Sequence, residues 1–99
     1  MKATLLTFLL LCLSLAVQAF PITFTNSGTG AVTVYVPGVS NPEVAAGSNV
    51  QLDVKEGQKV FFMANNRRYL LLIVDASHNG QTLDLATLIQ QRKTAIGIQ

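Results

Sequence analysis

The segment KVFFMANNRRYLLLIV, residues Lys59 to Val74, decides how this chain folds. Its first part, Lys59–Ala64, and its last part, Tyr69–Val74, are apolar at nearly every position. Strands that are covered on one face alternate apolar and polar residues, whereas strands covered on both faces are continuously apolar. We therefore predict a central hairpin whose strands are joined by a polar four-residue turn, Asn65–Arg68. One cover would be a second layer of strands, and the other would be the C-terminal segment.

Alternating segments before this hairpin predict further strands. Ile22–Thr25 and Ala31–Val36 alternate apolar and polar residues, and the glycine-rich stretch Asn26–Gly30 lies between them. Two alternating segments joined by a short glycine-rich stretch indicate a hairpin. Asn49–Lys55 alternates in the same way and predicts another half-buried strand.

The C-terminal part contains the one helical pattern. Apolar residues recur at helical spacing after Asp84, and either Asp84 or Thr82 could cap the start of the helix. We predict a helix of about nine residues, Leu83–Arg92, followed by a short strand within Thr94–Ile98. The whole pattern predicts a mainly β fold, a small antiparallel β-sandwich or roll of six to seven short strands with one short C-terminal helix.

The first nineteen residues, MKATLLTFLLLCLSLAVQA, have the three parts of a secretory signal. Lys2 supplies the positive start, Thr4–Val17 is an apolar core, and small residues place the cleavage site after Ala19. The apolar run is shorter than the about 20 residues of a transmembrane helix. We expect residues 1–19 to be a cleaved signal peptide and residues 20–99 to form one exported domain, periplasmic or extracellular, without a stable membrane anchor.

Removal of this segment would leave 80 residues with a net charge of +1, because Lys2 is the only charged residue in it. A charge so near zero gives no electrostatic reason to expect a nucleic-acid partner. Cys12, the only cysteine, would be removed as well, so the exported domain would have no disulfide and no thiol chemistry. A domain of this size must then depend on good packing or on self-association.

The sequence contains few groups suited to catalysis. His78 is the only histidine, so a Ser–His–Asp arrangement would have to use its neighbours Ser77 and Asp75. The following Asn79–Gly80 pair favours a solvated turn instead. The five acidic residues are scattered along the chain, and no metal-binding or cofactor-binding motif is present. We therefore predict a non-enzymatic protein without a cofactor, and a small enzyme is the least favoured alternative.

The polar cluster at the end of the central hairpin is one candidate site. A sugar or an anionic group could be bound by Arg67, Arg68 and Tyr69, with Tyr35 as a further contact. The alternative is an ordinary turn whose arginines keep two aggregation-prone strands soluble. The absence of tryptophan weakens the case for a glycan-stacking surface.

The apolar hairpin itself is the other candidate site. If one helix does not cover the whole sheet face, the remaining apolar surface would mark an interface, with Phe61, Met63, Leu71 and Ile73 as the candidate residues. An edge strand such as Ile22–Thr25 could also pair with a strand of a partner. A complete single-chain sandwich is the alternative. The leading prediction is an exported β module that binds another protein or itself, and a small-ligand or glycan-binding module is the second.

Overall fold

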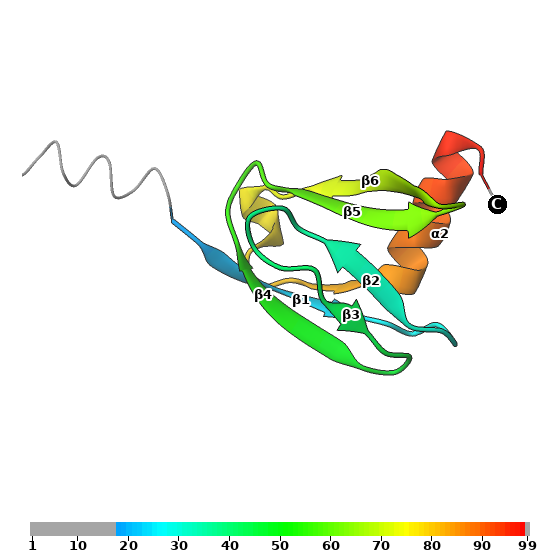
Figure 1. Ribbon diagram of the computed structural model, residues 1–99. Coiled ribbons are helices and arrows are strands. Elements are labelled where there is room, and N and C mark those ends of the chain that lie inside the picture. Colours follow the sequence, from blue (N-terminus) through cyan, green and yellow to red (C-terminus); the bar gives the residue numbers. More distant parts are fainter. Residues whose placement is uncertain (1–17, 99) are drawn as a thin grey trace, which may run out of the picture.

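The computed structural model describes residues 18–98, which form two packed β-sheets and one α-helix (Figure 1). The strands are β1 Phe20–Thr25, β2 Val32–Tyr35, β3 Glu43–Val44, β4 Asn49–Val54, β5 Lys59–Ala64, β6 Arg67–Ile73 and β7 Thr82–Asp84. A turn of 3-10 helix, η1, spans Ala76–His78, and the α-helix α2 spans Leu85–Ile96. The mainly β fold with a C-terminal helix is confirmed. Residues 1–17 of the predicted signal peptide lie outside the described residues, so that assignment stays a prediction.

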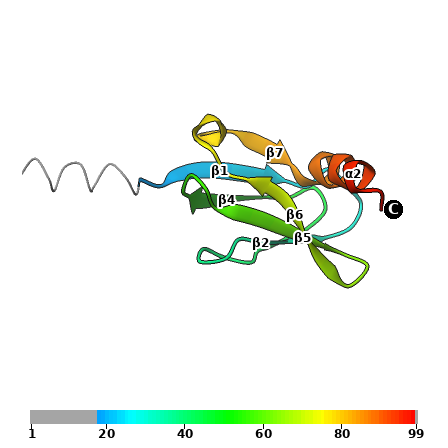
Figure 2. The same ribbon diagram turned by 90° about the horizontal axis from the view of Figure 1, so that it is seen from above.

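The strands form a three-stranded sheet in the order β4-β1-β7 and a four-stranded sheet in the order β3-β2-β5-β6. Figure 2 shows the two layers from above, with β1 and β7 in one layer and β2 and β5 in the other. All pairs are antiparallel except β1 with β7, which is parallel. The predicted antiparallel architecture is confirmed, and the one parallel pair arises because the chain crosses from one sheet to the other between β6 and β7 before it pairs with β1.

The core lies between the sheets and follows the alternation of the sequence. Ile22 and Phe24 of β1 pack against Val34 of β2 and Phe62 of β5, and all four side chains are almost fully buried. The intervening residues face outward, as the period-two pattern requires. The half-buried strand predicted within Asn49–Lys55 is also confirmed, because Val54 of β4 is buried and Val50 and Leu52 pack on the core.

The predicted hairpin between Ile22–Thr25 and Ala31–Val36 was wrong, because β1 and β2 belong to different sheets. Asn26 explains the difference. Its Nδ2 donates to the carbonyl oxygens of Gly30 and Val44, and its Oδ1 accepts from the N–H of Gly28. These bonds satisfy the backbone of the connection without a strand ladder, so the chain can cross from one sheet to the other.

The turn of the central hairpin is shorter than predicted. Asn65 and Asn66 alone form it, with φ angles of 52° and 62°, while Arg67 and Arg68 belong to β6. Two consecutive positive φ angles are typical of the tight turn whose twist matches a β-hairpin, and asparagine tolerates that conformation better than most residues. The strand β6 therefore begins two residues earlier than the apolar pattern indicated.

The helix also differs in its limits. Asp84 is the N-cap, and its side chain accepts from the N–H of Thr87. The helix continues past Arg92 to Ile96, where Gly97 ends it with a φ of 77°. The predicted strand within Thr94–Ile98 was therefore wrong, because helical hydrogen bonds continue through most of that segment.

The position of α2 leaves part of the outer face of the central hairpin exposed. The helix lies beside the edge strands β6 and β7, where Arg92 Nε donates to the carbonyl oxygen of Leu70 at 2.9 Å (Figure 1). The hairpin was expected to be covered on both faces, with the C-terminal segment as the second cover. One face packs against the other sheet, but Met63 and Ile73 on the outer face remain 45% and 50% exposed.

Candidate functional site

The outer face of the β5–β6 hairpin is built from cross-strand pairs. Met63 lies opposite Arg68, and Phe61 lies opposite Leu70. Tyr35 of β2 lies opposite Phe61 on the other side of β5. Since paired residues of neighbouring strands share a face, these five side chains form one surface on β2, β5 and β6. We call this surface, together with Ile73, the aromatic face.

A β-bulge decides which leucines belong to the aromatic face. The register shifts between Val60 and Phe61, so that Val60 pairs with Leu72 and Leu71 has no partner. Because of the extra residue, Leu72 faces the core as well as Leu71, which is only 8% exposed. The same shift places Ile73 opposite Lys59 on the outer face.

The four predicted interface residues are therefore separated by the bulge. Phe61, Met63 and Ile73 lie on the aromatic face, whereas Leu71 lies in the core. Leu70 belongs to the face but was missed by the sequence analysis. Counting the register outward from a two-residue Asn–Asn turn would have placed Leu70 opposite Phe61, so the signal was present in the turn.

The predicted polar site separates into two pairs. The Arg68 guanidinium lies over the ring of Tyr35, with its carbon 4.5 Å from the ring centroid, and it lies 6.0 Å from the centroid of Phe61. Tyr69 points the other way and packs at 5.8 Å from Phe62 in the core. Arg67 is two positions from Tyr69 and shares its face of the strand. Only Arg68 and Tyr35 of the four predicted residues come together.

The outer face of the other sheet has a different character. Thr23 of β1 pairs with Gln51 of β4, and Pro21 pairs with Asp53. Gln51 and Asp53 are exposed, so this face is polar and can be solvated without a partner. The contrast matters because monomers rarely expose a contiguous apolar surface unless it has a function.

The turn that contains His78 has its own local hydrogen bonds. Ser77 donates from both its N–H and its hydroxyl to Asp75 Oδ1, and His78 Nδ1 accepts from the N–H of Asp75 at 3.0 Å. The two bonds from Ser77 hold the pKa of Asp75 below its usual value. In this arrangement Ser77 donates to Asp75 and not to His78, so the three side chains form a helix cap.

Asp84 connects the helix to the loop after β1. The hydroxyl of Ser27 donates to it at 2.7 Å and the N–H of Ser27 at 2.9 Å, while Thr87 donates from its hydroxyl at 2.7 Å. The N–H of Thr87 at 3.2 Å and the hydroxyl of Thr25 at 3.3 Å are the two remaining donors. The hydroxyl of Ser27, then that of Thr87, and then the N–H of Ser27 lower the pKa of Asp84 far below its usual range. This carboxylate fixes the loop and the start of α2 in one geometry.

Two further observations concern the described residues as a whole. Nowhere between residues 18 and 98 do three or more His, Cys, Asp or Glu side chains gather in a way that could hold a metal ion. Of the helices in this part of the chain, none has the length and hydropathy of a membrane span.

Comparison with known proteins gives no relative. No protein-family model matches the chain, and neither the curated proteins nor the solved structures give a significant match.

Proposed function

We propose that the folded domain is an exported, non-enzymatic module that binds protein through its aromatic face. The observation that carries the proposal is the exposure of Met63 and Ile73 beside the rings of Tyr35 and Phe61. Methionine, aromatic side chains and arginine are the residue types enriched at the centres of protein interfaces. Arg68 supplies the arginine on the same surface.

The start of the fold supports the export part of the proposal. The first strand begins at Phe20, directly after the predicted cleavage site, while Gln18 and Ala19 are exposed and belong to no strand. Cleavage after Ala19 would therefore remove no residue of the described sandwich. We expect mass spectrometry of the protein recovered outside the cytoplasm to give an amino terminus at Phe20. Recovery of a chain that retains residues 1–19 would contradict the signal peptide.

Site-specific photocrosslinking tests the binding part of the proposal. The photoreactive amino acid p-benzoylphenylalanine would replace Met63 on the aromatic face, or Gln51 on the polar face of the other sheet, in the full-length sequence. Both positions are exposed, so neither replacement has to be accommodated in the core. We expect a discrete protein adduct from position 63 after illumination of producing cells and their medium, and none from position 51. Equal adducts from both positions, or none from position 63, would contradict the proposal.

Binding of a sugar or an anion is the second candidate, and it is supported only by the contact between Arg68 and Tyr35. One face of the Tyr35 ring is already covered by the guanidinium, which leaves less of the ring for a sugar to stack on. Thermal-shift screening separates the two candidates. Stabilisation by a saccharide or an anion that Arg68→Ala abolishes and Met63→Ala leaves intact would favour this second function.

A further inference from the structure

Two opposite charges lie at the two edges of the four-stranded sheet. On β3, Glu43 is paired with Thr33 of β2, and on β6, Arg68 is paired with Met63 of β5. Extension of the antiparallel β2–β5 register by one residue places Thr33 level with Met63. A single row, Glu43–Thr33–Met63–Arg68, therefore crosses the outer face, and the row beside it contains Tyr35, Phe61 and Leu70.

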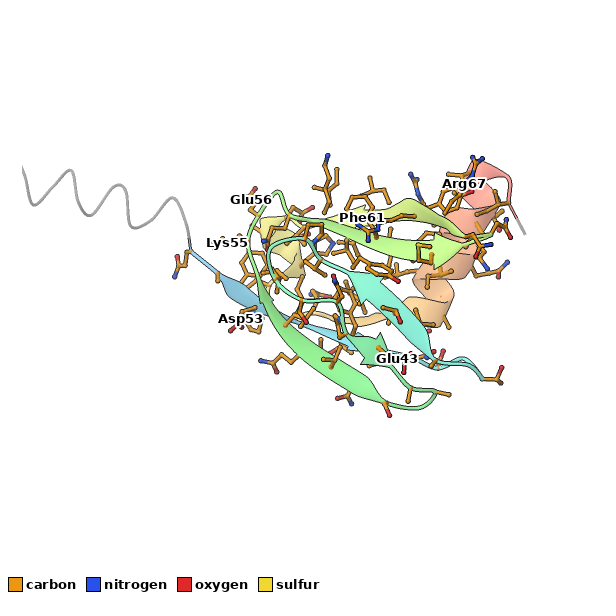
Figure 3. All side chains as sticks on the ribbon, in the orientation of Figure 1. Glu43, Asp53, Lys55, Glu56, Phe61 and Arg67 are labelled. Carbon is orange, nitrogen blue, oxygen red and sulfur yellow. The ribbon has the colours of Figure 1, made fainter. Side chains whose placement is uncertain are left out.

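These two charges cannot neutralise each other within one molecule. Neighbouring strands lie about 4.8 Å apart, so three strand spacings separate the backbones of Glu43 and Arg68 by about 14 Å. Neither residue takes part in an ion pair with any residue between 18 and 98. Figure 3 shows Glu43 on β3 at one side of the sheet, with Phe61 on β5 two strands away. The row thus has an acidic residue on one edge strand and a basic residue on the other, with Thr33 and Met63 between them, and the Arg68 guanidinium extends inward over the ring of Tyr35.

In a dimer whose twofold axis lies in the interface and is parallel to the strands, the row of one copy lies opposite the same row of the other copy. The order of the residues in the two rows is then reversed. The axis passes between β2 and β5, so β3 of one copy lies over β6 of the other. Glu43 on β3 then lies opposite Arg68 on β6 of the second copy, and Arg68 lies opposite its Glu43, so that each guanidinium can turn from the ring of Tyr35 to the carboxylate across the interface. The same operation places Tyr35 over Phe61 of the second copy, and two twisted sheets pack face to face in this nearly aligned way in β-sandwiches.

We propose that the protein bound by the aromatic face is a second copy of this chain, joined in this twofold arrangement. The inference rests on the function proposed above and names its partner. A twofold axis across the strands is disfavoured, since it would set Arg68 against Ile73 and Lys59 against Met63. When the axis is parallel to the strands, Lys59 lies near the end of β2 of the second copy and away from Lys59 of that copy. It therefore opposes no like charge.

Charge reversal tests the pairing. Sedimentation equilibrium would measure self-association of the protein expressed from its full sequence, with the variants Glu43→Arg, Arg68→Glu and the double variant. Reversal at either position sets like charges against each other twice per dimer, and we expect each single variant to dissociate at least about tenfold more readily. The double variant restores opposite charges and should return to within about threefold of the unmodified protein. The matched control Gln51→Glu, on the polar face, should associate normally.

Rescue in the double variant distinguishes a contact between copies from a loss of fold, since the two residues are too far apart to pair within one copy. Arg68→Gln, which removes the charge without reversing it, should weaken association less than Arg68→Glu does.

A protein that stays monomeric up to about 1 mM, near the weak limit of specific association, overturns the proposal, as does a double variant no better than the single ones. If a monomer still crosslinks from position 63 to a different protein, the second copy is excluded and the proposed function stands. If position 63 gives no adduct, both fail.

Discussion

At the scale of single residues, Asn26 is the one polar side chain that is fully buried in residues 18–98. Its amide makes two donated hydrogen bonds and one accepted bond, at 2.8, 2.9 and 3.0 Å. Its own backbone N–H and carbonyl bond to Ser48 and Gly47 near the start of β4. One residue therefore ties the β1–β2 connection to both sheets, which is why that connection does not form a hairpin.

Replacement of Asn26 by alanine should be among the most damaging polar substitutions. It leaves two carbonyl oxygens and one N–H without their partner, and we expect a loss of about 2–4 kcal/mol in the free energy of unfolding. Urea denaturation would measure it. Asn41→Ala, at an exposed position, is the matched control and should change stability by less than about 0.5 kcal/mol. Equal effects of the two substitutions would contradict the role given to Asn26.

Asp84 makes a prediction about pH. Folding lowers its pKa, so the ionised carboxylate stabilises the folded state. This contribution is complete above the ordinary aspartate pKa of about 4 and decreases as the pH falls below that value. Asparagine also caps helices, and Asp84→Asn removes the titration while keeping an acceptor. We expect this variant to be less stable than the unmodified protein at neutral pH and to lose less stability on going to about pH 3.

Urea denaturation at the two pH values measures this difference. Asp53→Asn, at an exposed position of β4, controls for the loss of one negative charge. Asp75 has the same direction of shift as Asp84, so some loss in acid should remain in the Asp84 variant. An acid sensitivity unchanged by Asp84→Asn would show that this carboxylate does not couple folding to pH.

At the scale of elements, the bulge in the β5–β6 hairpin sorts its apolar residues between core and surface. An unbroken two-residue hairpin would put Leu72 on the outer face and Ile73 inside. The extra residue in β6 exchanges them, while Leu71, which would face the core in either register, stays buried. The register shift moves the β6 residues after the bulge to the opposite faces of the sheet. Apolar side chains are accepted on both faces at this point, and the continuous apolar run of the strand is consistent with this.

Alanine substitution separates the two sides of the bulge. Leu71→Ala should cost about 2–5 kcal/mol, because it leaves a cavity in a well-packed core. Ile73→Ala removes a side chain that is half exposed, and we expect a change within about 0.5 kcal/mol. Chemical denaturation of the two variants side by side is the measurement. A loss from Ile73→Ala as large as that from Leu71→Ala would mean that the register runs without the bulge.

The Asn65–Asn66 turn gives a similar comparison within one element. At Asn66, with a φ of 62°, alanine should destabilise the protein by about 1–2 kcal/mol, since a β-carbon is disfavoured in the left-handed region. Glycine at the same position should be neutral or stabilising, because Asn-Gly is the preferred pair for this turn. Thermal unfolding of the two variants measures the difference. If alanine were tolerated as well as glycine, the turn would have a different geometry.

At the scale of the whole molecule, the sequence predicted the strand content, the C-terminal helix and most inward positions, because alternation and helical spacing are local signals. It did not predict which strands share a sheet. That choice depends on Asn26 and Asp84, whose partners lie far away in the chain, up to 59 residues for the bond from Thr25 to Asp84. For the same reason, the sequence predicted only part of the candidate site. Arg68 contacts Tyr35 because β2 pairs with β5, and this pairing could not be predicted from local patterns.

In the proposed dimer, the aromatic face of the whole molecule closes against a second copy. The chain has two methionines, and Met63 is the one in the described residues, so its methyl group is a reporter at the middle of the proposed interface. We would record its NMR resonance in methyl-labelled protein over a range of protein concentrations. The proposed dimer predicts a resonance that shifts or broadens as the concentration rises and that stays in place in the Glu43→Arg variant. A Met63 resonance that is constant at every concentration in the unmodified protein would contradict it.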